Sequence, residues 1–434
     1  MLLNRIEDAI TASFFKEFCW GRCIILLGGK MIEKVSYMSS PKAIVAVDDL
    51  CHRCLGQTLR VAENNHIYCE ECSKNRRMSD HLFLKRYQRK RKYKHYQLDI
   101  PFELSKQQIK GQVFIQDCYD SKNHGFLHAV CGAGKTEMTL QTIYEGLRKR
   151  KSIVFVIPRV EVIKELVKRF QSYFKHTHIC GLYHDQLMDE SADIFISTPQ
   201  QLVKFYREFD LMLIDEADAF PFYQNEYLYR LVEKALKPDG VKIYISATLP
   251  KDYQKKIDQE GLAYCLIPRR FHMNDLVIPS FEKYTYLFSD DILKAIQTYG
   301  LTEKRLMIYF PSIHLMSRYR YFLFKKGIDC KMISSKTRFK NAVLKAFTHH
   351  QFSVLLTTTI LERGVTYPNC DAYVLQADHP VFNRETLIQI AGRVGRDKTY
   401  VHGRLVFFSR FITGAMDAAK QSMLKMNQVT CGDM

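Results

Sequence analysis

Short apolar runs alternate with amphipathic segments along the chain from about residue 98 to its end. A strand buried on both faces of a parallel sheet reads as a nearly continuous apolar run, so this alternation predicts an α/β fold with parallel sheets. The strands are expected in two series, which predicts two similar lobes. The first series includes residues 126–130, 153–157, 194–197, 211–214 and 243–246, and the second includes residues 306–310, 330–333, 354–357, 372–376 and 405–408.

The length of the chain and the positions of its prolines suggest how it divides into domains. At 434 residues it is too long for one ordinary core and suits two domains with an appendage. Pro268 and Pro279 interrupt the alternation and place the linker near residues 268–285. We expect a segment of unknown role at 1–46, a four-cysteine module at 47–78, a basic aromatic connector at 79–97, a first lobe with ATP-binding motifs at 98–275 and a second lobe at 276–434.

A glycine-rich loop follows the first predicted strand. Residues 129–136 read Ala-Val-Cys-Gly-Ala-Gly-Lys-Thr and lead into a helix expected over 138–147. Backbone N–H groups of Gly132, Ala133 and Gly134, together with the helix N-terminus, would cradle phosphates. Lys135 would reach the β- and γ-phosphates, and Thr136 would bind Mg²⁺. The alternative is an ordinary glycine-rich turn between a strand and a helix.

Two carboxylates leave the end of the strand predicted at 211–214, where residues 215–218 read Asp-Glu-Ala-Asp. This arrangement suits a magnesium ligand, Asp215, followed by Glu216 as a base that orients an attacking water. A solvated strand end is the alternative. Small hydroxyl residues, Ser246 and Thr248, follow the next strand and can bond to the acidic motif and transmit its state, although an ordinary strand-to-turn junction also fits.

Residues 389–396 read Gln-Ile-Ala-Gly-Arg-Val-Gly-Arg. The spacings of four and three place Gln389, Arg393 and Arg396 on one face of a predicted helix, facing a nucleotide between the lobes. A guanidinium there can stabilise charge on the transferred phosphoryl group. Glycines inside a helix cost about 1 kcal/mol each relative to alanine, which suggests close approach by the opposite lobe. A basic surface helix is the alternative.

In this order the motifs resemble those of superfamily 2 helicases over residues 98–434. The resemblance implies two RecA-like lobes with ATP bound between them. It implies nucleic-acid contacts from Pro158, Arg159, Thr198, Pro199 and Thr358, and a coupling role for Ser246, Thr248 and Gln389. It also implies nucleotide contacts from Gly364 and from Gln108, which would read adenine, with Gln107 as the alternative. The final motif lacks the His-Arg start usual in RNA-remodelling DEAD-box proteins, and Thr358 replaces their usual aspartate. The pattern is therefore closer to DNA translocases of the replication-restart type.

Four cysteines form two pairs in the module at 47–78. Cys51 and Cys54 are separated by two residues, as are Cys69 and Cys72, with fourteen residues between the pairs. Four thiolates fill a tetrahedral Zn²⁺ shell and leave no open position, so a structural zinc site is predicted. Zinc would also stabilise a module too small for a core of its own. Two disulfides and an iron–sulfur cluster are the alternatives.

The formal net charge of +18 favours a polyanionic partner, with nucleic acid first and an anionic membrane surface as the alternative. Residues 85–94 contain seven cations and two tyrosines. Such side chains can neutralise phosphates and stack on unpaired bases. A solvated linker fits the same segment. No secretory signal or membrane-spanning segment is expected, and the scattered cysteines predict reduced thiols in a cytosolic protein.

A zinc module, a basic connector and a two-lobed motor together resemble the ComFA family of late-competence ATPases from about residue 47 onward. The resemblance implies ATP hydrolysis stimulated by single-stranded DNA, with ATP, Mg²⁺ and Zn²⁺ as cofactors. It also implies a cytoplasmic location, with attachment to the inner face of the membrane left open. The implied partners are ComFC and the membrane DNA-uptake channel, and homo-oligomerisation is left open. The competing hypotheses are a replication-restart or repair helicase and a nucleotide-gated zinc adaptor.

Overall fold

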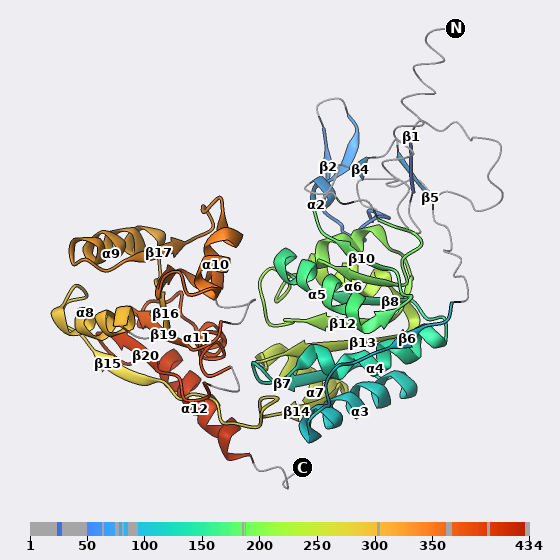
Figure 1. The fold of residues 1–434 in the computed structure, drawn as a ribbon. Helices are drawn as coiled ribbons and strands as arrows, with labels where there is room; N and C mark the ends of the chain where they lie inside the picture. Colours follow the sequence, from blue (N-terminus) through green and yellow to red (C-terminus); the bar gives the residue numbers. More distant parts are fainter. Residues whose placement is uncertain are drawn as a thin grey trace.

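The computed structural model describes residues 24–27, 50–62, 65–73, 78–79, 82–85, 94–184, 186, 188–301, 304–361, 367–396 and 400–429. The predictions for Gly364, for most of the segment at 1–46 and for most of the basic connector fall outside these residues. Figure 1 shows two lobes side by side, with a small module above the first.

The first lobe is built on a seven-stranded parallel sheet with the order β10-β11-β8-β12-β13-β7-β14. Its strands are β7 (Gly125–Ala129), β8 (Ile153–Val156), β10 (Ile179–Leu182), β11 (Ile194–Ser197), β12 (Phe209–Asp215), β13 (Leu236–Ser246) and β14 (Ala263–Ile267). Its helices are α3 (Lys106–Ser121), α4 (Lys135–Arg148), α5 (Val160–Tyr173), α6 (Glu226–Ala235), α7 (Lys251–Glu260) and the 3₁₀ helix η1 (Pro199–Lys204). Two short strands, β6 (Gln97–Leu98) and β9 (Phe174–Lys175), pair antiparallel beside it.

The second lobe is built on a six-stranded parallel sheet with the order β15-β20-β19-β16-β18-β17. Its strands are β15 (Ser280–Lys283), β16 (Arg305–Tyr309), β17 (Cys330–Ile333), β18 (Val354–Thr357), β19 (Cys370–Leu375) and β20 (Leu405–Ser409). Its helices are α8 (Asp290–Gln297), α9 (Ile313–Lys325), α10 (Lys340–Thr348), α11 (Arg384–Ala391), α12 (Gly414–Gln428) and the 3₁₀ helices η2 (Thr298–Leu301) and η3 (Thr359–Leu361).

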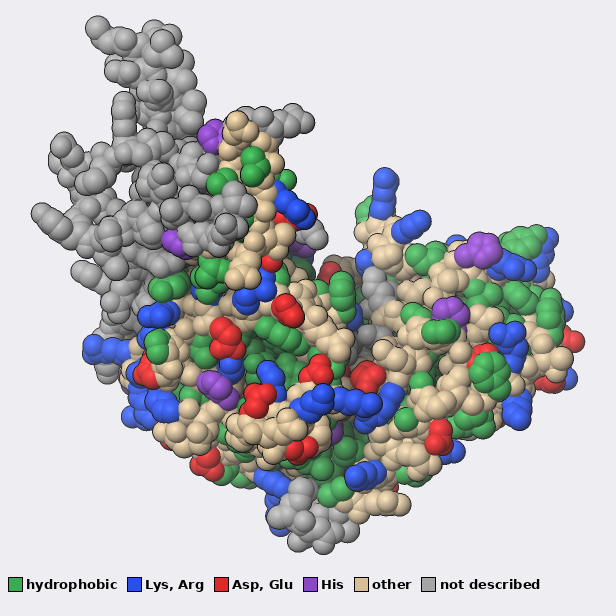
Figure 2. All heavy atoms as spheres, turned by 180° about the vertical axis from the view of Figure 1, so that it is seen from behind, with side chains coloured by type: hydrophobic (Ala, Val, Ile, Leu, Met, Phe, Trp, Pro, Cys, Tyr) green, Lys and Arg blue, Asp and Glu red, His purple; other side chains and the backbone are tan. Residues whose placement is uncertain are grey.

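Both sheets are covered by apolar side chains on their two faces, as parallel sheets require. Along β8, for example, Val154 and Val156 belong to one buried cluster and Phe155 to another. The cluster that contains Phe155 continues into the second lobe, so the lobes share a core. Seen from the opposite side, the lobes meet over the lower part of the molecule, with a notch between them above (Figure 2).

The predicted α/β fold with two RecA-like lobes is confirmed, and the predicted strands are found with small shifts at their ends. Strands β11, β17 and β18 match the expected ranges in full. The largest difference is β13, which begins at Leu236 rather than near residue 243, because its first residues pair with the start of β12. Residues 268–279 connect β14 of the first sheet to β15 of the second.

The expectation that residues 389–396 form one helix is wrong. Helix α11 ends at Ala391, Gly392 caps it, and Gly395 has a φ of +64° that side chains with a β-carbon rarely adopt. A β-carbon on Gly392 would lie 2.2 Å from the β-carbon of Cys131 in the first lobe. Gly395 therefore allows a turn, and Gly392 allows the two lobes to approach closely. Helix propensities do not account for either effect.

The N-terminal module is a three-stranded antiparallel sheet and one short helix. It comprises β2 (Leu59–Val61), β3 (Ile67–Cys69), β4 (Met78–Ser79) and α2 (Glu70–Ser73). Strands β1 (Ile24–Leu27) and β5 (Leu82–Lys85) form a separate antiparallel pair. Among the helices of the described residues, none combines the length and apolar character that a membrane crossing requires.

Candidate ATP site between the lobes and candidate zinc site

The glycine-rich loop connects the fully buried strand β7 to the N-terminus of α4. Gly132 has a φ of +84°, and Gly134, the N-cap of α4, has a φ of +78°. The loop lies at the start of a 14-residue helix, whose N-terminus favours an anion, and within the loop the Ala133 N–H donates to the Val130 oxygen at 3.1 Å. Lys135 and Thr136 begin the helix, and Ala133 is buried between the two glycines. The local geometry fits a phosphate-binding loop.

Gln108 lies beside this loop, although its amide also has a structural role. Its Oε1 accepts a hydrogen bond from the Ser105 backbone N–H at 2.9 Å, which completes a capping box at the start of α3. A β-carbon on Gly134 would lie only 2.1 Å from Nε2 of Gln108. The side chain is thus buried against the phosphate loop, and its reading of adenine stays a prediction.

The acidic motif begins at the end of β12. Asp215 Oδ1 accepts a hydrogen bond from the Glu216 backbone N–H at 2.8 Å, and Glu216 has a φ of +53°. Burial raises the pKa of Asp215 to about 6, and the nearby charge of Lys135 opposes that rise. The carboxylate therefore lies within the electrostatic reach of the phosphate loop. Glu216 Oε2 lies 3.5 Å from Nε of Arg159, which forms an ion pair with it.

The residues predicted to bind magnesium fit that ion. Thr136 opens the helix that follows the phosphate loop, and Asp215 is an oxygen donor whose neighbouring cation is Lys135. Hydroxyl and carboxylate oxygens are ligands that Mg²⁺ prefers. In this structure the Thr136 hydroxyl accepts a hydrogen bond from Arg169 at 3.5 Å. Magnesium binding by these two residues stays a prediction.

Asp218, the last residue of the acidic motif, joins three motifs. Its Oδ2 accepts hydrogen bonds from Thr248 Oγ1 at 2.7 Å and from Gln389 Nε2 of the second lobe at 3.5 Å. Ser246 Oγ accepts from the Thr248 backbone N–H at 3.1 Å. Sequence reasoning assigned no role to Asp218, because only the tertiary fold brings Gln389 to it.

The phosphate loop also touches the second lobe directly. Cys131 Sγ donates to Gln389 Oε1 at 3.2 Å. A β-carbon on Gly132 would lie 3.6 Å from Cγ of Arg396, so Arg396 lies against the loop. Burial lowers the pKa of Arg396 to about 10, and repulsion from Arg393 adds to the shift. Arg393 is buried close to Arg396, while its charge also acts on Tyr367.

The residues predicted to contact nucleic acid follow the carboxyl ends of parallel strands. Pro158 and Arg159 follow β8, where Arg159 is the N-cap of α5, and Thr198 and Pro199 follow β11 at the start of η1. Thr358 follows β18 of the second lobe. Ligands of open α/β sheets bind at this edge, where the phosphate loop and Asp215 also lie. The structure therefore places these residues on the functional edge of each sheet, and their contacts with nucleic acid stay predictions.

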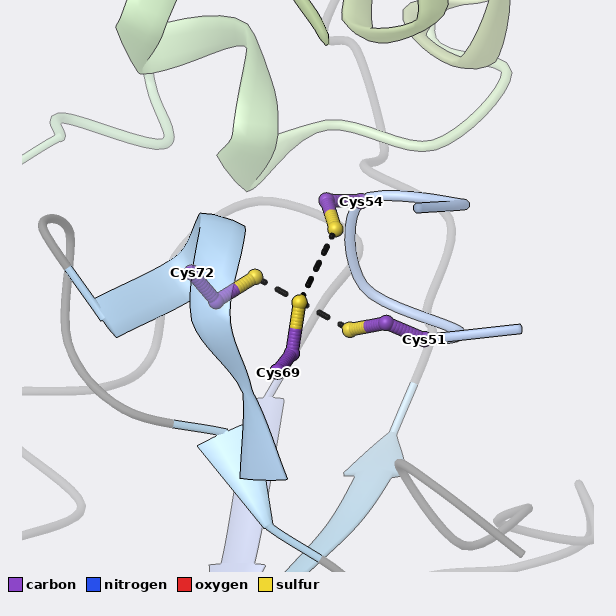
Figure 3. Close-up of side chains that lie close together, drawn as sticks. All are labelled: Cys51, Cys54, Cys69 and Cys72. Carbon is purple, nitrogen blue, oxygen red and sulfur yellow. Dashed lines mark hydrogen bonds between the residues drawn. The ribbon is translucent and has the colours of Figure 1, made fainter. Parts of the chain in front are cut away.

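The four predicted zinc ligands come together in the N-terminal module. Their sulfur atoms all lie within 4.8 Å of one another, and all four residues are buried (Figure 3). The Cys51–Cys72 and Cys54–Cys69 sulfur separations are 3.8 and 3.6 Å. A tetrahedral shell with Zn–S bonds of about 2.3 Å has sulfur–sulfur edges of about 3.8 Å. The four cysteines, none of which forms a disulfide, thus fit zinc.

The module packs on the first lobe through two basic residues of α6. Lys234, which is 4% exposed, donates to the backbone oxygens of Arg53 at 2.6 Å and Val203 at 2.8 Å. Arg230 forms an ion pair with Glu71 of the module. Val203 belongs to η1, which begins at Pro199. Lys234 is therefore bonded both to the cysteine module and to the helix that follows Thr198.

Comparison with known families agrees with this architecture. Residues 73–251 match the family model described as "Type III restriction enzyme, res subunit", and residues 290–398 match "Helicase conserved C-terminal domain". Among solved structures, the chain is similar to Saccharomyces cerevisiae Dbp5 bound to RNA and ADP BeF3, with a TM-score of 0.54 and 16% identity over 75% of this chain and 92% of that one. The Mycobacterium smegmatis helicase Lhr gives a TM-score of 0.55 and 14% identity over 75% of this chain and 50% of that one. These similarities concern the fold.

Two curated relatives match most of the chain. "Competence protein ComFA" of Streptococcus pneumoniae is 32% identical over 376 residues, which cover 83% of this chain and 86% of that protein. "Competence protein ComFA" of Bacillus subtilis is 30% identical over 401 residues, which cover 87% and 86%. A more distant relative, the transcription-repair-coupling factor of Staphylococcus aureus, is 22% identical over 69% of this chain and 27% of that protein.

Proposed function

Because the chain belongs to the ComFA family of competence proteins, we propose that it is an ATP-dependent motor that moves along single-stranded DNA and drives the uptake of transforming DNA. A competence-related, helicase-like ATPase is the coarser description that family membership carries. The observation that supports the motor proposal most strongly is the contact of three motifs at Asp218, which joins the acidic motif, Thr248 and the second lobe.

In this proposal ATP binds between the lobes, against the loop of Gly132, Ala133 and Gly134. Lys135 binds the β- and γ-phosphates, and Thr136 and Asp215 hold a magnesium ion, which would neutralise charge that develops on the transferred phosphoryl group. Glu216 orients the attacking water and accepts its proton. Arg393 and Arg396, supplied by the second lobe, stabilise the transition-state charge.

Hydrolysis would change the contact between the lobes. Gln389 bonds both to Cys131 in the phosphate loop and to Asp218. Loss of the terminal phosphate would remove the anion that Lys135 of the first lobe shares with Arg393 and Arg396 of the second, and the weakened attraction would let the lobes separate. Since Arg159, Thr198 and Thr358 are spread over both lobes, each opening and closing would shift the lobes along a bound strand.

The ion pair between Arg159 and Glu216 offers a route from DNA to the catalytic carboxylate. Arg159 Nε lies 3.5 Å from Glu216 Oε2. A DNA phosphate would compete for the guanidinium and release Glu216 to orient water. We therefore expect Arg159→Ala to raise the DNA-free ATPase rate several-fold and to reduce stimulation by single-stranded DNA to about twofold or less.

The measurement is the steady-state ATPase rate with and without DNA. Arg159→Lys, which keeps the positive charge, is the matched control and should retain low DNA-free activity. A DNA-free rate in the alanine variant equal to or below that of the wild type would contradict this route.

The experiment that tests the proposed function is the ATPase rate of the purified chain alone and with single-stranded DNA, duplex DNA or RNA. Strong stimulation by single-stranded DNA is the expected result. Preferential stimulation by RNA would indicate RNA remodelling instead. Efficient strand separation without accessory proteins would favour a replication-restart or repair helicase. No stimulation, together with nucleotide-dependent partner binding, would favour a zinc adaptor.

The family resemblance also carries the proposals on partners and location. We propose ComFC and the membrane DNA-uptake channel as partners, and a position on the cytoplasmic face of the membrane. Pull-down of ComFC from competent cells by the tagged chain is the direct test. Sedimentation of the purified chain with and without single-stranded DNA would determine whether copies of the motor assemble on the strand.

A further inference from the structure

We propose that Arg270, in the connection between the two lobes, is an additional ATP-binding residue that contacts the terminal phosphate. This inference rests on the proposed nucleotide site but not on movement along DNA. Sequence reasoning did not single out Arg270. It lies three residues after the end of β14, outside the motifs identified in the sequence.

Arg270 is buried without enough hydrogen-bond acceptors. Its side chain is 1% exposed, which places it among the largest fully buried side chains of the described residues. Nη1 donates to the backbone oxygen of Gly395, in the turn that follows α11. Nε and Nη2 are buried and have no partner. A buried guanidinium with unused donors is unfavourable unless an acceptor occupies the neighbouring space at some stage of the cycle.

The guanidinium stem lies against the phosphate loop. A β-carbon on Gly132 would be 3.6 Å from Cγ and 3.7 Å from Cδ of Arg270. The backbone holds this position, because the N–H of Phe271 donates to the Gly132 oxygen at 2.9 Å. The same point on Gly132 is 3.6 Å from Cγ of Arg396. Two arginine side chains, one from the linker and one from the second lobe, therefore flank the first glycine of the loop.

Arg270 lies close to a second positive charge, that of Arg396. Burial lowers its pKa to about 10, and its charge in turn helps to lower the pKa of Arg396. The acceptor of its Nη1 hydrogen bond is the Gly395 carbonyl rather than a carboxylate. An anion that enters between the arginines and the loop would offset this repulsion and accept the unused N–H groups. Because Arg270 lies against the predicted phosphate-binding loop, that anion would be a phosphate of the nucleotide.

The contact with the second lobe indicates which phosphate of the nucleotide Arg270 would bind. Arg270 contacts both Gly132 of the first lobe and Gly395 of the second, so it lies where the lobes close over the end of the phosphate chain. A contact made only with the terminal phosphate distinguishes ATP from ADP. Arg270 would thereby link the nucleotide state to the linker that sets the spacing of the lobes.

The test compares ATP and ADP affinity in Arg270→Lys. Lysine retains the charge and one donor for the Gly395 carbonyl, but it lacks the planar set of additional N–H groups. Affinities are measured with Mg²⁺ and without DNA, by displacement of a fluorescent ADP, in a Glu216→Gln background that prevents hydrolysis. We expect ATP affinity to fall about tenfold or more, with ADP affinity changed less than twofold.

Arg269→Lys is the matched control, because the neighbouring Arg269 forms an ion pair with Asp275 and donates to the Asn427 oxygen, away from the loop. It should leave both affinities unchanged. Arg270→Gln is the second variant, and thermal unfolding verifies that each protein is folded. Equal loss of ATP and ADP affinity would assign Arg270 a purely structural role, and no loss would also overturn the proposal. A wild type that DNA fails to stimulate would refute the motor instead, since these affinities are measured without DNA.

Discussion

Replacing Glu216 by glutamine is expected to lower the rate of ATP hydrolysis by about 10²–10⁴-fold while ATP binding is retained. The substitution keeps the size of the side chain and removes only its ability to accept a proton from water. Glu216 is not part of the phosphate loop, and it forms an ion pair with Arg159. The measurement is the ATPase rate at saturating single-stranded DNA, combined with ATP affinity by equilibrium titration.

Comparison of Lys135→Ala with Glu216→Gln separates a role in ATP binding from a role in hydrolysis. Lys135 is the first residue of α4, and its charge acts on Asp215. Its removal should abolish turnover and also weaken ATP binding, whereas Glu216→Gln should trap bound ATP. Hydrolysis at the wild-type rate in either variant would refute the assignment of this site. A loss of ATP affinity in Glu216→Gln as large as that in Lys135→Ala would show that the carboxylate acts in binding.

Replacing Cys51 by alanine is expected to reduce bound zinc from one ion per chain to nearly none. Structural zinc in small modules contributes apparent binding free energies of about 10–16 kcal/mol, and three thiolates cannot complete the tetrahedral shell. Hydrogen bonds from Cys54, Cys69 and Cys72 lower the pKa of Cys51, which favours its thiolate. The measurement is metal content by elemental analysis, together with protease sensitivity of the module.

Cys330→Ala is the matched control, because Cys330 is a buried free thiol of the second lobe. It should keep its zinc. ATP affinity should be unchanged in Cys51→Ala, since the module is bonded at Arg53 to Lys234 of α6, which bonds in turn to Val203 of η1 and not to the phosphate loop. DNA affinity should fall, because Lys234 supports both the module and the segment after Thr198. Unchanged metal content in Cys51→Ala would refute the four-cysteine site.

Local patterns along the chain were sufficient for the fold class, the strands and the two sites with short spacings. A strand buried on both faces is mostly apolar, so β11 and β18 could be located to the residue. The phosphate loop and the cysteine pairs are likewise local, because a loop conformation or a metal knuckle needs neighbouring residues. Their local geometry is therefore predictable from the sequence, while their ligands stay predictions.

Contacts between distant segments could not be read in this way. Residues 389–396 have helical spacing, yet α11 ends at Ala391 because the chain must turn beside Cys131 of the other lobe. Asp218 accepts hydrogen bonds from Thr248, 30 residues away in the sequence, and from Gln389, 171 residues away. Arg270 looks like any linker arginine until burial leaves it with unused donors beside Gly132. Each of these features depends on the packing of one lobe against the other, and no periodicity within either lobe encodes that contact.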